Sequence, residues 1–321
     1  MKKFIKILII TTMLLTILSG CVVKRIKVCS TIYPIQYLLE KIGGNRIDTC
    51  NIGDNTQIIR SSLSPTYRID LVDATTIMYA GGVEPYLDLY SSEFLDAGYS
   101  LLDATMNANL YLFKRYTIIK TNNEFLAVDS KYYPETDLFD NVDLYNNDPY
   151  VWLDPIAFTS MARTMTDYLI KNQPLDEEYF NNNYEELESE LANLDAQYQE
   201  LKNNVVPKFV TVTPSFGNWQ KSYGVEIYPT ILSRYGVVPN QQQQNYLIEY
   251  IKNKNIKYIA YETNLPDDIQ AFYDKLVNEL SLKPIKLYNL SFITDEQVAD
   301  GEDYLSLMKA NLRSLQELQG E

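Results

Sequence analysis

Short apolar runs alternate with amphipathic segments along the first half of the chain. The run "IKVCSTIYP", which starts at Ile26, has the length and composition of a buried strand, and "IQYLLEKIGG" has apolar residues at helical spacing before a pair of glycines. The order repeats, because the strand-like "TTIMYAGG" precedes the helical "EPYLDLYSSEFLDAG". Strands that alternate with helices predict parallel strand–helix–strand units.

Residues 174 to 205 follow a different pattern. Apolar side chains recur there at alternating steps of four and three, the spacing of one face of an amphipathic helix: Phe180, Tyr184, Leu187, Leu191, Leu194, Tyr198 and Leu201. Such a helix would be roughly 40 Å long. A coiled coil has similar spacing, but this seam covers few heptads and lies between two strand–helix patterns. A packed connecting helix is therefore favoured.

The strand–helix alternation restarts after residue 205. The runs "KFVTVTP", "VEIYP", "IKYIAYE" and "PIKLYNL" are strand-like, and "GEDYLSLMKANLRSLQELQG" closes the chain as a helix. The predicted fold class is α/β, with two similar lobes, each a mostly parallel sheet flanked by helices, joined by one long rigid helix. The predicted domains are an N-terminal lobe (26–173), a linking helix (174–205) and a C-terminal lobe (206–321). Because ligands bind beyond the carboxyl ends of parallel strands, we expect the site between the lobes.

The first residues are typical of an export signal. Three lysines lie around Phe4 and Ile5, ahead of the apolar run "ILIITTMLLTIL", and "LSGC" follows. A membrane-spanning helix needs about 20 apolar residues, so a signal peptide (1–20) is favoured over a transmembrane anchor. "LSGC" also resembles the lipobox of bacterial lipoproteins, in which the cysteine carries the lipid. Cys21 is thus the predicted lipid attachment site, residues 21–25 form a tether, and the protein is placed on the extracytoplasmic face of a bacterial membrane.

Two further cysteines, Cys29 and Cys50, leave an alternative open. An exported chain with an even number of cysteines is expected to form a disulfide. The same residues could also be small buried thiols in neighbouring strands. Neither interpretation makes them catalytic.

Composition excludes several classes of function. Acidic residues outnumber basic ones, 42 to 28, so nucleic acid is not an expected partner. The chain has no histidine, which removes the usual base of hydrolases and the commonest transition-metal ligand. We find no serine or cysteine nucleophile beside a base and no phosphate-binding glycine loop, and we predict a monomer that is not an enzyme. The acidic segment "PETDLFDNVDLYNND" lacks EF-hand spacing and is interpreted as a solvated loop rather than a calcium site.

Several segments together resemble one known family, the solute-binding lipoproteins of zinc and manganese ABC importers (metal-binding cluster A-I type). The resemblance runs from about Ile26 to the end of the chain, and the similar segments occur in the family's order. They are "TIYPIQYLLEKIGGNRID", "YAGGVEPYLDLY", "DPYVWLDP", "FVTVTPSFGNW", "NIKYIAYE" and "GEDYLSLMKANL". The resemblance implies two α/β lobes bridged by one helix, a metal ion held between them, and an ABC permease as the membrane partner.

The resemblance also implies four metal-ligand positions, and this chain has other residues at each. The two histidines of the family correspond to Ile59, in "IGDNTQIIRSSLSP", and to Tyr150, in "DPYVWLDP". The third ligand, His or Glu, corresponds to Thr213. The fourth, usually Asp or Glu, corresponds to Ser291 or, with a shifted register, to Asn289.

These replacements change the expected chemistry of the cleft. Zinc is held by thiolate, imidazole or carboxylate, whereas isoleucine cannot ligate, a neutral hydroxyl is a weak ligand, and a phenol must lose a proton with a pKa of about 10. We therefore predict no high-affinity zinc or manganese site at the family position and no cofactor. Glu262, at the end of "IKYIAYE", is the carboxylate expected to face the cleft. It would either contact a ligand or form a structural hydrogen bond to a neighbouring loop.

The functional prediction is a lipid-anchored, extracytoplasmic solute-binding component of a metal-type ABC importer, with a histidine-free cleft and a small solute that the sequence does not identify. The alternative is a degenerate protein of the same fold that has no role in transport. It would serve on the cell surface as an adhesin or as a module of an envelope complex.

Overall fold

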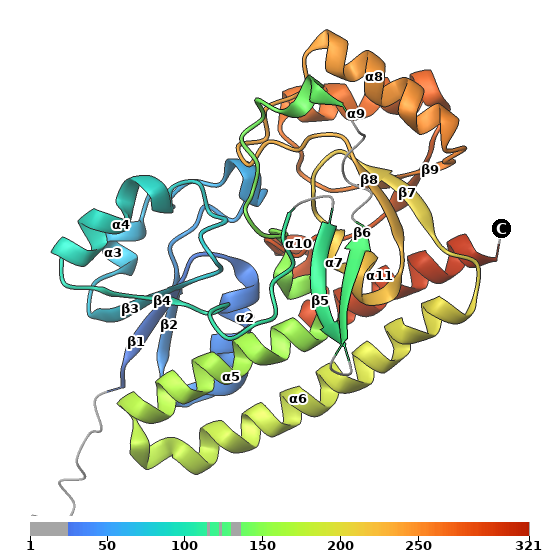
Figure 1. The fold of residues 1–321 in the computed structure, drawn as a ribbon. Coiled ribbons are helices and arrows are strands. Elements are labelled where there is room, and N and C mark those ends of the chain that lie inside the picture. Colours follow the sequence, from blue (N-terminus) through green and yellow to red (C-terminus); the bar gives the residue numbers. More distant parts are fainter. Residues whose placement is uncertain (1–24, 114–115, 122–123, 130–135, 321) are drawn as a thin grey trace, which may run out of the picture.

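Each half of the chain builds a parallel four-stranded sheet. The computed structural model describes residues 25–113, 116–121, 124–129 and 136–320 (Figure 1). The N-terminal sheet has the strand order β2-β1-β3-β4 and the C-terminal sheet the order β10-β9-β7-β8. The strands are β1 (Lys27–Ser30), β2 (Asp48–Asn51), β3 (Ala74–Tyr79), β4 (Ser100–Asp103), β7 (Lys208–Thr211), β8 (Glu226–Pro229), β9 (Tyr258–Tyr261) and β10 (Lys283–Lys286). The predicted α/β class with two similar lobes is confirmed.

Helices cover both sheets. In the N-terminal half they are α2 (Tyr33–Gly43), α3 (Tyr67–Asp70), α4 (Leu87–Asp96) and α5 (Pro155–Asn172), and in the C-terminal half α7 (Gly217–Tyr223), α8 (Gln241–Asn253), α9 (Asp267–Leu280), α10 (Asp295–Ala299) and α11 (Tyr304–Gln319). Local sequence sets several of their starts. Reciprocal capping boxes begin α8, with Asn240 and Gln243, and α11, with Asp303 and Ser306.

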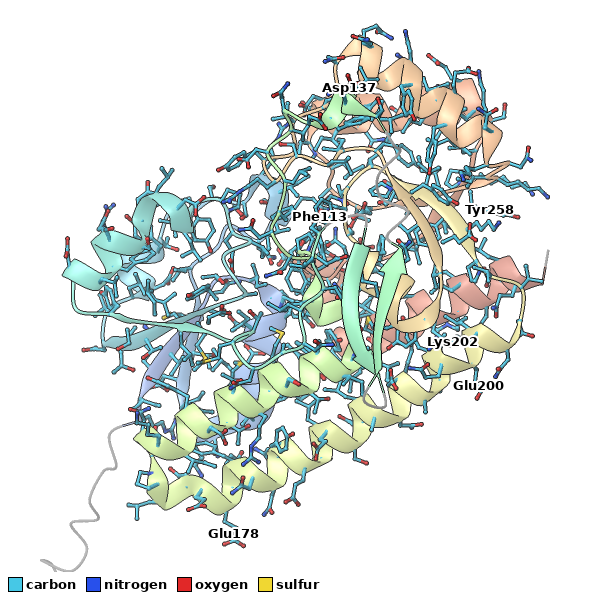
Figure 2. The ribbon with its side chains drawn as sticks, in the orientation of Figure 1. Phe113, Asp137, Glu178, Glu200, Lys202 and Tyr258 are labelled. Atoms are coloured by element: carbon cyan, nitrogen blue, oxygen red, sulfur yellow. A yellow bond between two sulfur atoms is a disulfide. The ribbon has the colours of Figure 1, made fainter. Side chains whose placement is uncertain are left out.

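The predicted linking helix forms largely as expected. Its regular part is α6 (Glu177–Gln199), and 3₁₀ turns at Pro174–Asp176 and Glu200–Asn203 extend it at both ends. All seven apolar residues of the predicted face are buried. The helix packs along α5 and also contacts α2 of one lobe and α7 and α11 of the other, so it supports both lobes from one side (Figure 1). Glu178 and Glu200, near its two ends, point away from the body (Figure 2).

The segment between the N-terminal sheet and α5 reaches across to the other lobe. It includes an antiparallel hairpin that the sequence did not predict, β5 (Tyr116–Thr121) and β6 (Glu124–Asp129). The following 3₁₀ turn, Asp137–Phe139, lies beside α8 (Figure 2). There the centre of the Phe139 ring lies 6.4 Å from the centre of the Tyr246 ring. The carbonyl of Leu138 accepts a 2.8 Å hydrogen bond from Gln243 Nε2.

The N-terminal targeting features predicted from the sequence, including Cys21, lie outside the described residues. None of the helices in the described part of the chain combines the length and apolarity needed to cross a membrane.

Strand register explains the cysteine pair. Residues Cys29 of β1 and Cys50 of β2 lie directly opposite each other in the parallel ladder. Their Cα atoms are 4.5 Å apart, and a disulfide joins them. The bridge ties the central strand of the sheet to its edge strand.

Reduction of this disulfide should lower the free energy of unfolding by about 3 kcal/mol, because an open chain has more unfolded conformations than one closed into a loop. The measurement is urea unfolding with and without a thiol reductant. The double variant Cys29→Ala/Cys50→Ala is the control, since the reductant should leave its midpoint unchanged. Equal midpoints for the oxidised and reduced wild-type protein would contradict the prediction.

Candidate functional site

A buried carboxylate lies where the strands of the C-terminal sheet end. Glu262 directly follows β9 and is only 1% exposed. Its Oε1 accepts hydrogen bonds from the hydroxyls of Thr211 (3.0 Å) and Thr213 (2.7 Å), and its Oε2 accepts from Ser215 Oγ and Asn289 Nδ2 (both 2.6 Å). Thr211 ends β7, and the other donors follow β7 and β10. Adjacent parallel strands thus deliver these polar groups to one edge of the sheet.

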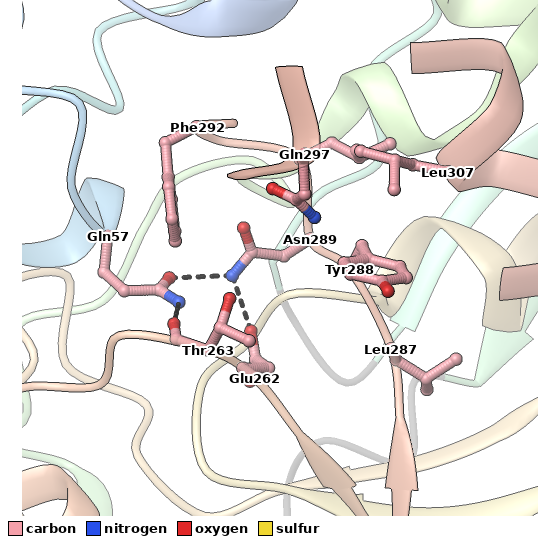
Figure 3. A pocket seen from close by; sticks show the side chains of 10 residues that line it. Gln57, Glu262, Thr263, Leu287, Tyr288, Asn289, Phe292, Gln297 and Leu307 are labelled. Carbon is pink, nitrogen blue, oxygen red and sulfur yellow. Dashed lines mark hydrogen bonds between the residues drawn. The ribbon is translucent and has the colours of Figure 1, made fainter. Parts of the chain in front are cut away.

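The Glu262 network continues across the cleft to the N-terminal lobe. Asn289 Nδ2 also donates to Gln57 Oε1 over 2.7 Å, and Gln57 Nε2 donates to the Thr263 carbonyl over 2.8 Å (Figure 3). The Asn289 side-chain oxygen accepts from the backbone N–H and the hydroxyl of Ser291, and its backbone carbonyl accepts from Trp152 Nε1. One amide side chain therefore connects both lobes with the last loop of the site.

Tyr150 lies in this region as a buried neutral phenol. It is fully buried, and its ring centre lies 5.1 Å from that of Trp152. Burial raises the pKa of Tyr150 well above its ordinary value, and the nearby charge of Glu262 raises it further, although the hydroxyls of Ser215 and Thr213 act in the opposite direction. The phenol therefore stays protonated at neutral pH and does not offer a metal the phenolate that ligation requires.

The rest of the "DPYVWLDP" motif is structural. Asp154 caps α5, where its Oδ1 accepts hydrogen bonds from the backbone N–H groups of Ile156 and Ala157. Asp148, also buried, accepts a hydrogen bond from Asn218 of α7. These contacts fix both flanks of Tyr150 independently of any ligand.

Ile59 occupies a different part of the lobe interface. It is buried within a 3₁₀ turn, Ile58–Arg60. It also packs closely against Gly236 of the other lobe, because a Cβ atom added to Gly236 would lie 3.0 Å from the Cδ1 atom of Ile59. Its neighbour Gln57 is the residue that reaches the Glu262 network. Sequence analysis missed Gln57, Thr211 and Ser215. The available signals were weak. Gln57 and Ser215 each lie two residues from a predicted ligand position, and Thr211 lies at the end of a predicted strand.

Further contacts hold the two lobes together. Arg60 Nη2 lies 2.6 Å from Asp268 Oδ2 and donates to the Gly236 carbonyl over 2.8 Å. The hydrogen bond between the Arg60 guanidinium and the Asp268 carboxylate is the main cause of the lowered pKa of Asp268. Asn55 Nδ2 donates to the Ile293 carbonyl over 2.8 Å, and Arg234 pairs with Asp88. These contacts join the two lobes across the cleft.

Little free volume remains beside Glu262. The adjoining cavity measures about 10 Å³, which is roughly the room that one water molecule needs. It is lined by Gln57, Glu262, Thr263, Leu287, Tyr288, Asn289, Leu290, Phe292, Gln297 and Leu307 (Figure 3). Across the described residues, no group of three or more His, Cys, Asp or Glu side chains is placed to hold a metal ion.

The structure therefore brings together most, but not all, of the residues expected at the site. Thr213 and Asn289 bind Glu262 directly, Ser291 binds Asn289, and Tyr150 lies beside them. Ile59 is placed instead against Gly236. Chemically, the arrangement is a buried carboxylate that accepts hydrogen bonds from four neutral donors.

Comparison with known proteins relates this fold to zinc-uptake proteins. The chain is 25% identical over 300 residues to the zinc-binding lipoprotein AdcA of Streptococcus pneumoniae (strain ATCC BAA-255 / R6), a match that covers 91% of this chain and 56% of AdcA. The chain thus spans about half the length of the curated relatives it matches.

Two solved structures share the fold. The Zn(II)-bound ZnuA-like domain of Streptococcus pneumoniae AdcA superposes with a TM-score of 0.67 at 23% identity, covering 92% of this chain and 100% of that one. The laminin-binding protein Lmb of Streptococcus agalactiae, described as bifunctional with adhesin and metal transporting activity, gives 0.70 at 18% identity and covers 91% and 99%. The model of the family described as "ZnuA: Zinc-uptake complex component A periplasmic" matches residues 28–318. The resemblance found in the sequence is therefore confirmed, and the chain belongs to the ZnuA family of metal solute-binding proteins.

Proposed function

We propose that this protein is the lipid-anchored, extracytoplasmic solute-binding component of an ABC importer. Family membership and the zinc-binding lipoproteins among its relatives support this role, as do the export signal (1–20) and Cys21 in the sequence. The lobes, with boundaries proposed at residues 26–173 and 206–321, would capture a solute and deliver it to a membrane permease.

The observation that carries the finer proposal is the self-satisfied Glu262 network. The carboxylate that could contribute to a metal site already accepts four hydrogen bonds. The positions equivalent to the family's ligands hold an alkyl group, a neutral phenol and two hydroxyls, which are poor ligands for zinc. We therefore infer that the cleft does not use the family's zinc or manganese chemistry.

The same network indicates which solutes fit. The groups that hydrogen-bond to Glu262 are neutral hydroxyls and one amide, so its negative charge has no cationic partner among them. When the lobes separate, the bonds of Gln57 break and the network becomes accessible. A small solute that carries positive charge or several N–H donors would then compensate the carboxylate better than neutral hydroxyls do.

The filled cleft also keeps the second candidate function open, that of a surface interaction protein outside transport. A structural neighbour, Lmb, is described as having adhesin activity beside metal transport. Solute capture separates the two candidates, because an interaction module needs no lobe opening. A screen of small cationic and amine solutes by thermal shift, with no stabilisation by any of them, would favour the interaction role.

The tag-free mature protein, first stripped with a chelator, should bind neither zinc nor manganese stoichiometrically at submicromolar concentration. Equilibrium dialysis followed by elemental analysis measures this directly. The ZnuA-like domain of Streptococcus pneumoniae AdcA, which is known in a Zn(II)-bound form, is the positive control. One tightly bound equivalent of either metal would overturn the proposal of a substituted site.

Ligands restored at the family positions should create zinc binding. The double variant Tyr150→His/Thr213→His places imidazoles at the two family positions that lie beside Glu262 and retains this carboxylate. It should bind one zinc ion in the same dialysis experiment, because two imidazoles and a glutamate are a known zinc ligand set. The matched control is Tyr150→Phe/Thr213→Val, which alters the same positions without adding donors. If the histidine variant folds and binds no more zinc than this control, the assignment of these positions is wrong.

The Glu262→Gln variant should lose about 1–3 kcal/mol of unfolding free energy, because its new N–H₂ group would face donors that need an acceptor. Urea unfolding measures the change. Glu249→Gln is the matched control, since Glu249 is exposed and forms a 3.0 Å ion pair with Lys252 of the same helix; it should change stability by less than about 1 kcal/mol. Equal stability of the Glu262 variant and wild type would show that the network is not saturated by donors.

A further inference from the structure

A polar hollow lies at the end of the N-terminal lobe where the described chain begins. It has a volume of about 310 Å³ and is lined by Arg25, Asn45, Arg46, Gln173 and Asp176. The residues come from three separate segments: the start of the chain, the turn after α2, and the turn between α5 and α6. Figure 1 shows the beginning of β1 and the α5–α6 turn at the same end of the molecule.

Gln173 fixes the shape of this hollow. It is 6% exposed, and its Oε1 accepts the Ile26 N–H over 2.9 Å. Its Nε2 donates to the Arg46 carbonyl over 3.2 Å and to Asp176 Oδ2 over 3.0 Å. All three segments are therefore joined through one buried amide side chain.

The two arginines at the hollow keep much of their hydrogen-bonding capacity. Arg25 Nη1 lies 3.9 Å from Asp48 Oδ1, and Arg46 Nη1 lies 3.4 Å from Asp176 Oδ1, with the arginine side chains 54% and 51% exposed. Each of these ion pairs is long and engages one nitrogen, whereas a guanidinium carries five N–H donors. The Arg46 guanidinium also lies over the ring of Tyr179, 5.1 Å from its centre, which holds it in place.

Exposed apolar side chains flank the arginines. Leu175, between Pro174 and Asp176 in the α5–α6 turn, is 86% exposed. Val72 is also exposed, and its carbonyl accepts a 3.0 Å hydrogen bond from Lys27 Nζ, two residues from Arg25. Arginine, tyrosine and isolated large apolar side chains on one surface are typical of proteins that lie at a membrane interface.

We propose that this surface, formed by Arg25, Arg46, Gln173, Leu175 and Val72 and named here the base, binds the phosphodiester head groups of anionic phospholipids. The proposal rests on the membrane attachment at Cys21 in the proposed function. Cys21 precedes Arg25 by only four residues, and four residues of any chain span at most about 14 Å. A lipid on Cys21 therefore brings the bilayer surface to the base.

Charge favours the same orientation. The whole chain has a formal net charge of −14, so an anionic bilayer repels most of its surface. The base presents two guanidiniums, which bind phosphate oxygens in a bidentate manner. Each guanidinium is paired with a carboxylate, that of Asp48 or Asp176, and in contact with the base the lipid phosphates would compete with these carboxylates for the guanidinium N–H groups.

The test attaches the protein chemically, so that it does not depend on lipidation in a host. Protein starting at Cys21 is coupled through that thiol to a maleimide lipid in nanodiscs, because Cys29 and Cys50 are joined in the disulfide. Hydrogen–deuterium exchange is then compared between nanodiscs of phosphatidylcholine alone and nanodiscs that contain phosphatidylglycerol. Peptides that cover Arg25, Arg46 and Gln173–Asp176 should exchange about fivefold more slowly, per arginine engaged, on phosphatidylglycerol.

The double variant Arg25→Gln/Arg46→Gln should lose this protection. The matched control is Arg68→Gln/Arg163→Gln, which removes the same charge from two exposed arginines elsewhere, each paired with an acidic residue; it should keep the protection. Equal exchange on both lipids, or equal loss in the control, would overturn the proposal. Protection of uncoupled protein by inorganic phosphate to the same extent would assign the hollow to a free anion instead. Native lipidation and solute capture play no part in this experiment, so their failure would leave its outcome unchanged.

Discussion

Burial of the Glu262 charge is the constraint on which the arrangement of the cleft depends. A carboxylate removed from water is costly unless hydrogen bonds replace its hydration. Here one donor, Thr211, ends β7, the other three follow β7 and β10, and the carboxylate follows β9. The hydrogen bonds to this one carboxylate therefore fix the ends of three strands relative to one another. They organise the C-terminal half of the site without a contribution from a ligand.

The same constraint couples the lobes. Asn289 donates both to Glu262 and to Gln57, so the amide that satisfies the carboxylate also binds the opposite lobe. Arg60 adds a second bridge through Asp268 and Gly236. In a protein that closed around an ion, the ion would supply the contacts between lobes. In this structure direct hydrogen bonds join the lobes, and any separation of the lobes would have to break the bonds of Gln57 and Arg60.

Much of the fold could be predicted because its signals are local. Apolar runs marked the four strands of the C-terminal sheet and, in the N-terminal sheet, strands such as β1 and β3, but no run predicted β4. The face from Phe180 to Leu201 marked the linking helix, since periodicity reports burial directly. A strand end also indicated Glu262, whereas Thr213 and Asn289 were predicted from the family resemblance. Gln57 could not be identified in this way. It lies in an irregular polar segment whose path, and hence whose partner across the cleft, depends on how the lobes pack.

Resemblance and structure also contribute differently to the site. The family positions predicted where Tyr150 would lie, but its protonated state follows from burial beside Glu262, which only the fold reveals. The shifted alternative in the last loop shows the same limit. Ser291 contacts Asn289, and Asn289 contacts the carboxylate, so both residues take part in the network and sequence alignment alone could not assign their separate roles.

The helix α5 connects the cleft to the base. Its N-terminal cap, Asp154, lies four residues after Tyr150, and the helix ends one residue before Gln173. Its 18 residues span roughly 27 Å at 1.5 Å per residue, so a molecule whose base lies on the bilayer holds the segment around Tyr150 at the far end of a rigid rod. If the anchored protein delivers its solute to a permease in the same bilayer, as proposed, the base would first have to release its lipid contacts. Capture and delivery would then occur in different orientations of one attached molecule.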